Sequence, residues 1–188
     1  IKSTVISMMT LDVQEQLSFI EELESKNIQA LIITPINDPA IAQKLQSMAD
    51  RGIQIVTVTA AITGVDCLAS VGCDNERSGR VAANLMHLFV KKPSKIAAFI
   101  GFDNMLAHEL RVKGLCAAIN EKYSELSVAL VAKTQDNDLQ TYLQTQRTLR
   151  NYPDVDIFFY AGAGVHGGIR AICESDRRDQ IMVIAYDF

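Results

Sequence analysis

The sequence predicts an α/β protein in which parallel β-sheets are flanked by helices. Short apolar runs alternate with segments of helical periodicity along the whole chain, which is typical of successive βαβ units. Most of the apolar runs are continuous, as expected for strands that are buried on both faces of a sheet. The 188 residues are 48% hydrophobic and 21% charged, a globular composition with enough chain for one or two cores.

Eight strands are predicted, most of them from short apolar stretches that contain β-branched or aromatic residues. They are expected at residues 4–9, 30–34, 53–58, 69–73, 96–100, 128–132, 157–160 and 181–185. Ligands of such sheets bind beyond the carboxyl ends of the strands. The polar residues that follow each strand are therefore the candidates for a binding site.

Helices are predicted between the strands. The first is expected to end near Asn27, a residue type that tolerates the left-handed conformation of a helix end. The second begins after Asp38 and Pro39, which suit the N-cap and the first helical position, and it stops at Gly52. Four further helices are expected at residues 78–90, 105–122, 139–151 and 165–175.

One linker-like break interrupts this alternation. Residues 91–95, with the sequence Lys-Lys-Pro-Ser-Lys, combine charge with a proline between a predicted helix and a predicted strand. Proline and charged residues are typical of a connection outside a packed core. This stretch is the best candidate for a boundary between two lobes.

The composition argues against several classes of protein. The 18 Lys+Arg and 22 Asp+Glu residues give a net charge of −4, which disfavours binding to nucleic acid through phosphate neutralisation. No apolar run approaches the roughly 20 residues that cross a bilayer, so no membrane contact is expected. The four cysteines lack the spacing of a zinc site, so we expect no metal; they are Cys67, Cys73, Cys116 and Cys173. We also expect their thiols to be reduced and the protein to be cytoplasmic. An exported, disulfide-bonded protein is the alternative.

A glycine motif near the end of the chain indicates a second kind of function. Gly162, Gly164 and Gly167 form a G-x-G-x-x-G that follows a predicted strand and opens a predicted helix, and Asp187 lies 20 residues after Gly167. That spacing is typical of a dinucleotide site, with a pyrophosphate at the helix N-terminus and a carboxylate on a ribose hydroxyl. The alternative is a tight turn from strand to helix.

Two other segments offer single chemical groups. Arg111 carries a planar fork of donors suited to hydroxyls or a carboxylate, although an arginine paired on the surface is the alternative. His108, in the same segment as Arg111, is expected to be exposed to solvent or to cap a helix. In the second segment, Asp74 either accepts hydrogen bonds from a polyol or caps a helix. No nucleophile with its base is recognisable, so we expect no enzyme activity, no catalytic residue and no cofactor.

Taken in order, these segments resemble the effector-binding region of lac-repressor-type (LacI/GalR) transcriptional regulators. That family shares its fold with periplasmic sugar-binding proteins. The resemblance spans essentially the whole chain. It is carried by residues 29–35, 71–75, 99–101 and 183–187, together with Gly79, Ala82, Ala83, Arg111 and Gly114.

The resemblance implies a fold like that of type I periplasmic binding proteins, with two similar lobes and a small ligand held between them. Residues 1–92 would form the N-terminal lobe and residues 93–188 the C-terminal lobe. The implied ligand-binding residues are Thr34, Asp74, Arg111, Asn137 and Asp187. Fixed carboxylates and a guanidinium would satisfy several sugar hydroxyls at once.

The chain departs from the family pattern in two ways. Many relatives place an acid after the seventh strand, whereas this chain has the glycine-rich residues 160–164 and no carboxylate there. The resemblance also implies that the first strand and helix precede Ile1, that the return segments follow Phe188, and that a DNA-binding helix-turn-helix lies outside this chain. The fold is therefore expected to be incomplete at both ends.

The function expected from the resemblance is sensing of a sugar or sugar-like effector by a LacI-type regulator. Such a protein is expected to be a cytoplasmic homodimer that reaches operator DNA only through its helix-turn-helix. One alternative is a periplasmic sugar-binding protein of an ABC transporter. The other is a nucleotide-binding enzyme that uses the G-x-G-x-x-G at residues 162–167.

Overall fold

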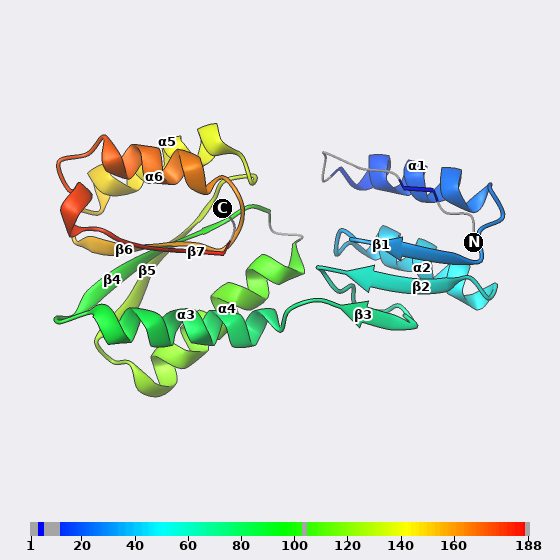
Figure 1. Cartoon of the computed structure of the whole chain (residues 1–188), viewed down its shortest axis with the longest axis horizontal. Helices are drawn as coiled ribbons and strands as arrows, with labels where there is room; N and C mark the ends of the chain where they lie inside the picture. The colour runs from blue at the N-terminus through cyan, green and yellow to red at the C-terminus, as the bar shows by residue number, and fades with distance from the viewer. Residues whose placement is uncertain (1–3, 6–11, 103–104, 187–188) are drawn as a thin grey trace. The chain divides into compact units, whose positions relative to one another are not determined.

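The computed structural model describes residues 4–5, 12–102 and 105–186 (Figure 1). It divides into two compact units, Ile1–Gly72 and Cys73–Phe188. In each unit parallel strands are covered by helices, which confirms the predicted α/β class. The predicted strand at residues 4–9 and the predicted ligand residue Asp187 lie wholly or largely outside the described residues.

The first unit contains a three-stranded parallel sheet in the order β1-β2-β3. The strands are β1 (Ala30–Ile33), β2 (Gln54–Val58) and β3 (Ala69–Val71), and the helices are α1 (Val13–Glu24) and α2 (Pro39–Asp50). Leu31 and Ile55 pack with Ile20 and Leu45 in one core cluster. Ile32, on the opposite face of β1, is 68% exposed, so the described helices cover one face of this sheet.

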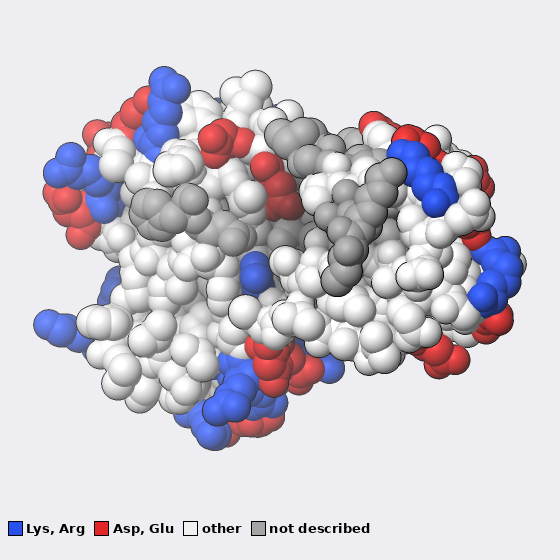
Figure 2. All heavy atoms as spheres, turned by 45° about the vertical axis from the view of Figure 1, so that its right-hand side comes forward, with Lys and Arg blue, Asp and Glu red and all other residues white. Residues whose placement is uncertain are grey.

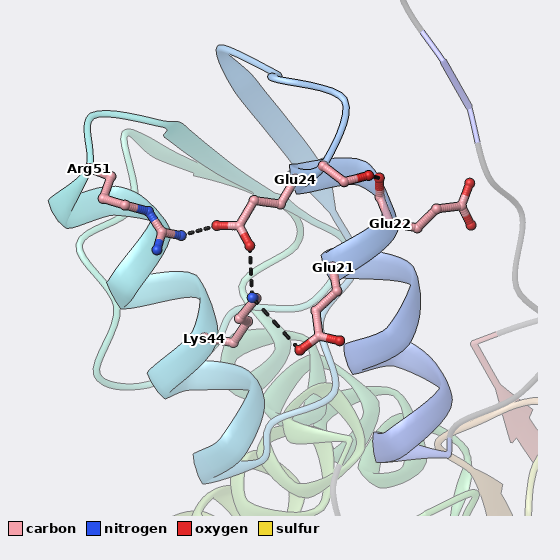
Figure 3. Close-up of polar contacts among 6 residues, drawn as sticks. Glu21, Glu22, Glu24, Lys44 and Arg51 are labelled. Carbon is pink, nitrogen blue, oxygen red and sulfur yellow. Dashed lines mark hydrogen bonds and ion pairs between the residues drawn. The ribbon is translucent and has the colours of Figure 1, made fainter.

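Ion pairs join the two helices of the first unit (Figure 3). Lys44 Nζ on α2 lies 2.8 Å from Glu24 Oε2 and 3.8 Å from Glu21 Oε1 on α1. Arg51, the C-cap residue of α2, pairs with the other oxygen of Glu24. Because these side chains are partly exposed, solvent weakens the pairs, and the apolar contacts beneath them dominate the packing.

The second unit contains a four-stranded parallel sheet in the order β5-β4-β6-β7, with helices on both faces (Figure 1). The strands are β4 (Ser94–Ile100), β5 (Leu126–Lys133), β6 (Val155–Tyr160) and β7 (Met182–Ala185). The helices are α3 (Asn75–Phe89), α4 (Leu106–Lys122), α5 (Asp138–Asn151), α6 (Val165–Cys173) and the short 3₁₀ helix η1 (Arg178–Gln180). The described elements lie close to the predicted ranges, although α3 starts three residues before its predicted first residue because Asp74 caps it.

Alternate residues of the central strand β4 divide the core of the second unit into two layers. Ile96 and Ile100 face the cluster that includes α3 and α4, whereas Phe99 faces the cluster that includes α6. The side chains of a strand point to opposite faces in turn, so a strand buried on both faces must be apolar throughout. Its burial explains why the continuous apolar run predicted this strand correctly.

The division between the units differs from the predicted lobe boundary. Residues 91–95 lie inside the second unit, because α3 packs on α4 of that unit. Helical periodicity predicts α3, but it does not predict the element on which this helix packs. The lobes predicted as residues 1–92 and 93–188 thus differ from the two units by α3 and the turn after it.

Candidate functional site

Arg111 is fixed by three contacts near the carboxyl ends of the strands of the second unit. Its Nε donates to Asn75 Oδ1 at 3.0 Å, and its Nη1 donates to the carbonyl oxygen of Ala161, just after β6, at 2.7 Å. The guanidinium carbon lies 4.3 Å from the centre of the Tyr186 ring, within the range of a cation–π interaction. The guanidinium is thus held in one orientation where ligands of parallel sheets bind.

A close crossing of two helices places Arg111 beside Asn75. A Cβ atom on Gly79 would lie 1.9 Å from the carbonyl oxygen of Arg111, and one on Gly114 would lie 1.9 Å from that of Glu76. Only glycine permits such an approach of two helix backbones. Asn75 and Arg111 lie about one turn before these glycines, so the crossing brings their side chains together.

Two other predicted ligand residues cap helices. Asp74 Oδ1 accepts from the backbone N–H of Arg77 at 2.9 Å, and it is the N-cap of α3. Asn137 Oδ1 accepts from the N–H groups of Leu139 and Gln140 at 2.9 and 3.1 Å, and it is the N-cap of α5. Capping accounts for part of the hydrogen-bonding capacity of each residue, and a ligand contact by either stays a prediction.

Thr34, the predicted ligand residue of the first unit, directly follows β1. Its carbonyl oxygen accepts from Gln16 Nε2 at 3.2 Å, while Gln16 Oε1 accepts from the N–H of Ile36 at 2.9 Å. The buried side chain of Gln16 therefore holds the backbone on both sides of Pro35. This contact fixes the loop after β1, where the resemblance implies a ligand contact.

A polar hollow of about 440 Å³ lies where α5 and α6 begin. Its lining combines two helix starts with the glycine-rich loop after β6. It consists of Asp136, Asn137, Asp138, Ala163, Gly164, Val165 and His166. Of the four predicted ligand residues that the structure describes, Asn137 is the one that lines it. The carboxylates, amide and imidazole in this lining provide hydrogen-bond acceptors and donors for a polar ligand.

Asp136 belongs to the polar residues that follow the predicted strands, but it is not one of the five predicted ligand residues. Its Oδ1 accepts from the N–H of Ala163 at 2.8 Å, and its carboxylate lies over the backbone of Gly101 and Gly162. Asp136 has a positive φ of 51° and the preceding Gln135 one of 54°. The sequence shows a polar pair after β5, but it contains no signal for the left-handed backbone that turns Asp136 toward β6.

His108 is buried, not solvated or a cap as expected from the sequence. It is 5% exposed, and its Nδ1 accepts from the N–H of Gly101 at 3.3 Å. Its ring also approaches the loop after β6, because a Cβ on Gly162 would lie 2.8 Å from His108 Cε1. The buried imidazole thus contacts the ends of β4 and β6, close to the Gly162 backbone that Asp136 also approaches.

Contacts within the protein account for the glycines of the G-x-G-x-x-G motif. Gly164 has a φ of +85° at the start of α6, which favours glycine. A Cβ on Gly162 would lie 2.4 Å from Asp136 Oδ1, and one on Gly167 would lie 1.8 Å from the carbonyl oxygen of Asp138. Gly162 and Gly167 therefore let neighbouring protein atoms approach closely. These contacts explain both glycines without a bound pyrophosphate. These contacts favour the turn over the dinucleotide site.

Surface charge, the cysteines and helix hydropathy each add one observation. On the face shown in Figure 2, Lys and Arg side chains lie next to Asp and Glu side chains, in keeping with the modest net charge. All four cysteines are free thiols, and burial raises the pKa of the Cys67 and Cys116 thiols. None of the described helices has the length and hydropathy needed to span a bilayer.

Comparisons with known proteins agree on the fold. The family model described as a periplasmic binding protein domain matches residues 2–188. The ribose import binding protein of Bacillus subtilis (strain 168) is 24% identical over 177 residues, covering 94% of this chain and 56% of that protein. The chain therefore spans little more than half the length of this curated relative.

Two solved structures illustrate the similarity. A glucose-galactose binding protein from Geobacillus stearothermophilus superposes with a TM-score of 0.87 at 18% identity, covering 94% of this chain and 63% of that one. An arabinose binding protein from the same organism gives a TM-score of 0.75 at 25% identity, covering 94% and 60%. The parallel sheets flanked by helices are thus of the periplasmic binding protein type I kind.

Proposed function

Because the chain belongs to the periplasmic binding protein domain family, we propose that it is the sugar-binding part of a solute-binding protein that serves a sugar importer. The names of its relatives, which are import and sugar-binding proteins and not enzymes, favour this reading over the regulator expected from the sequence. The structural observation that carries it is the guanidinium of Arg111, oriented by Asn75, Ala161 and Tyr186 at the carboxyl ends of the strands.

A sugar suits this arrangement for chemical reasons. A guanidinium donates in a fixed plane, so it discriminates between hydroxyl positions of a rigid ring. Aromatic and charged groups together bind both the apolar and the hydroxyl-bearing faces of a sugar. Burial raises the pKa of Tyr186, whose ring lies beneath the Arg111 guanidinium.

Titration calorimetry of the full-length protein with D-ribose, D-arabinose, D-allose and D-galactose tests this function. We expect at least one of these sugars to bind and to raise the melting temperature, as required for a ligand that binds the folded state. Arg111→Lys should weaken that binding about tenfold or more, because a lysine lacks the planar fork. Arg170→Lys, on the exposed face of α6 where it pairs with Glu174, is the matched control and should bind like the wild type.

Absence of binding and of thermal stabilisation with all four sugars would contradict the proposed function. Wild-type affinity in Arg111→Lys would instead remove Arg111 from the site while leaving the function in place.

The LacI-type regulator is a second candidate, and the four free thiols favour it. Free cysteines, two of them exposed, suit a reducing cytoplasm. We propose in that case a cytoplasmic homodimer that reaches operator DNA through a separate helix-turn-helix. Fractionation of cells that produce the full-length protein separates the candidates: an importer component is expected in the exported fraction, and a regulator in the cytosol. Sugar-dependent retention on DNA by the cytosolic protein would establish the regulator.

A further inference from the structure

The loop after β6 lacks the acid that the family resemblance predicts there, since residues 162–164 are Gly, Ala and Gly. We propose that the carboxylate of Asp136, from the loop after β5, takes the place of that acid and selects sugars by accepting a hydrogen bond from a ring hydroxyl. This role rests on the proposed function, and it adds a specificity-determining residue to the site.

The backbone carries Asp136 from β5 across the end of β4. Thr134 donates to the carbonyl oxygen of Ile100 through its N–H at 2.8 Å and through its Oγ1 at 3.0 Å. The N–H of Gln135 donates to the carbonyl oxygen of Gly101 at 2.9 Å. Gln135 and Asp136 then adopt positive φ, a conformation that costs energy for any residue other than glycine but that aspartate tolerates. The loop is thus fixed on the neighbouring strand before it reaches β6.

Two glycines make room for the carboxylate. A Cβ on Gly101 would lie 2.2 Å from Asp136 Cγ, and one on Gly162 would lie 2.4 Å from Asp136 Oδ1. β4 and β6 are paired neighbours in the sheet, so these two positions lie beside each other. Any larger residue at either position would displace the carboxylate from the strand ends.

The hydrogen bond to Ala163 orients the carboxylate and leaves other acceptor positions of the carboxylate available. Oδ1 receives the N–H of Ala163 at 2.8 Å, whereas an ionised carboxylate offers about four acceptor positions. Asp136 lines the polar hollow next to Asn137. An acceptor-only group in this position suits a hydroxyl that donates a hydrogen bond.

The other carboxylate of the hollow has a structural role. Asp138 is the first residue of α5, and its Oδ1 accepts from the N–H of Gly167 on α6 at 3.2 Å. The close contact between Gly167 and the Asp138 backbone fixes these two helix starts together. Asp136 differs from Asp138 in lying against Gly101 and Gly162 at the strand ends, and we therefore place it in the role of the missing acid.

Asp136→Asn in the full-length protein tests the role of the carboxylate. Asparagine has nearly the same shape, tolerates positive φ and keeps an oxygen that can accept from Ala163, so the melting temperature without sugar should be unchanged. Calorimetry with D-ribose, D-arabinose, D-allose and D-galactose should show affinity reduced about ten- to a hundredfold, the loss expected for a hydrogen bond to a charged group.

Asp179→Asn is the matched control. Asp179 is exposed, and it lies in η1, which precedes β7 at the amino end of the sheet, opposite the hollow. This variant should bind like the wild type. Monodeoxy analogues of the bound sugar provide a second measurement: one analogue should bind the wild type more weakly than the parent sugar does, but should bind Asp136→Asn with the same affinity as the parent.

The outcomes separate this role from the function on which it rests. If the wild type binds none of the four sugars, the proposed function fails and the role of Asp136 fails with it. If the wild type binds a sugar and Asp136→Asn binds the same sugars with equal affinity and rank order, only the role of Asp136 is overturned. A lower melting temperature of Asp136→Asn without sugar, together with an unchanged response to every deoxy analogue, would assign it a purely structural role.

Discussion

Tyr160 carries a hydroxyl into the core of the second unit. The residue is 1% exposed, stacks on Phe99 with ring centres 4.8 Å apart, and its hydroxyl lies 2.9 Å from Thr145 Oγ1 on α5. Thr145 is itself fully buried, so the two hydroxyls satisfy each other. Burial raises the pKa of Tyr160, and the hydrogen bond to Thr145 offsets this in part.

Tyr160→Phe should lower the free energy of unfolding by about 1 kcal/mol at neutral pH, because it removes a buried hydrogen bond. Above the unfolded pKa of 10.0, the unfolded wild type loses the Tyr160 proton while the folded state keeps it. Above that pH, the free energy of unfolding of the wild type therefore falls by about 1.4 kcal/mol per pH unit because of Tyr160. The advantage of the wild type over Tyr160→Phe should shrink in urea titrations from about pH 9 to about pH 11. Parallel pH profiles of the two proteins would contradict this.

The candidate site illustrates what single residues reveal in a sequence. Arg111 was selected because its chemistry suits hydroxyls, and the structure holds it near the strand ends. Asp136 follows a predicted strand, but its position could not be predicted, because it depends on two positive φ values and on glycines 35 and 26 residues away in the chain. Burial of His108 likewise depends on contacts with Gly101 and Gly162, which no local pattern indicates.

At the scale of the element, the crossing of α3 and α4 connects packing to the site. Gly79 and Gly114 allow the two backbones to touch, and Asn75 and Arg111 meet one turn away. Apolar periodicity predicts each helix separately. It does not predict the crossing, because a glycine in a helix can serve close packing or merely be tolerated.

Gly114→Ala should destabilise the protein by about 1–3 kcal/mol, the cost of overpacking, although alanine favours a helix by about 1 kcal/mol over glycine. Sugar affinity should fall as well, because separation of the helices breaks the Asn75–Arg111 hydrogen bond. Lys113→Ala, at the neighbouring and exposed position of α4, is the control and should change stability by less than about 0.5 kcal/mol. Denaturant unfolding and calorimetry measure both effects, and a stabilised Gly114→Ala protein would disprove the close contact.

For the whole molecule, the sequence was sufficient for the fold class, whereas the lobes expected at residues 1–92 and 93–188 stay a prediction. Alternating strands and helices of ordinary length leave the parallel α/β arrangement as the natural solution. The apolar stripe of α3, in contrast, fits either the sheet before it or the sheet after it. Its assignment to the second unit depends on long-range contacts with α4, and a local feature such as the Lys-Lys-Pro linker carries no information about them.

The order of the strands has a consequence for how the chain acquires its structure. In the first unit the strands pair in the order in which they are synthesised, whereas the central strand β4 of the second unit pairs with both β5 and β6. β4 ends at Ile100, but its second partner, β6, ends at Tyr160. β4 therefore cannot pair fully on both sides until some 60 more residues have left the ribosome. Pairing of strands so far apart in the sequence slows folding. The chain loses entropy when the loop between the strands closes, before the contacts between the strands stabilise it. During that interval the edge of β4 that later pairs with β6 lacks its partner, and an unpaired apolar strand edge promotes aggregation in a nascent chain.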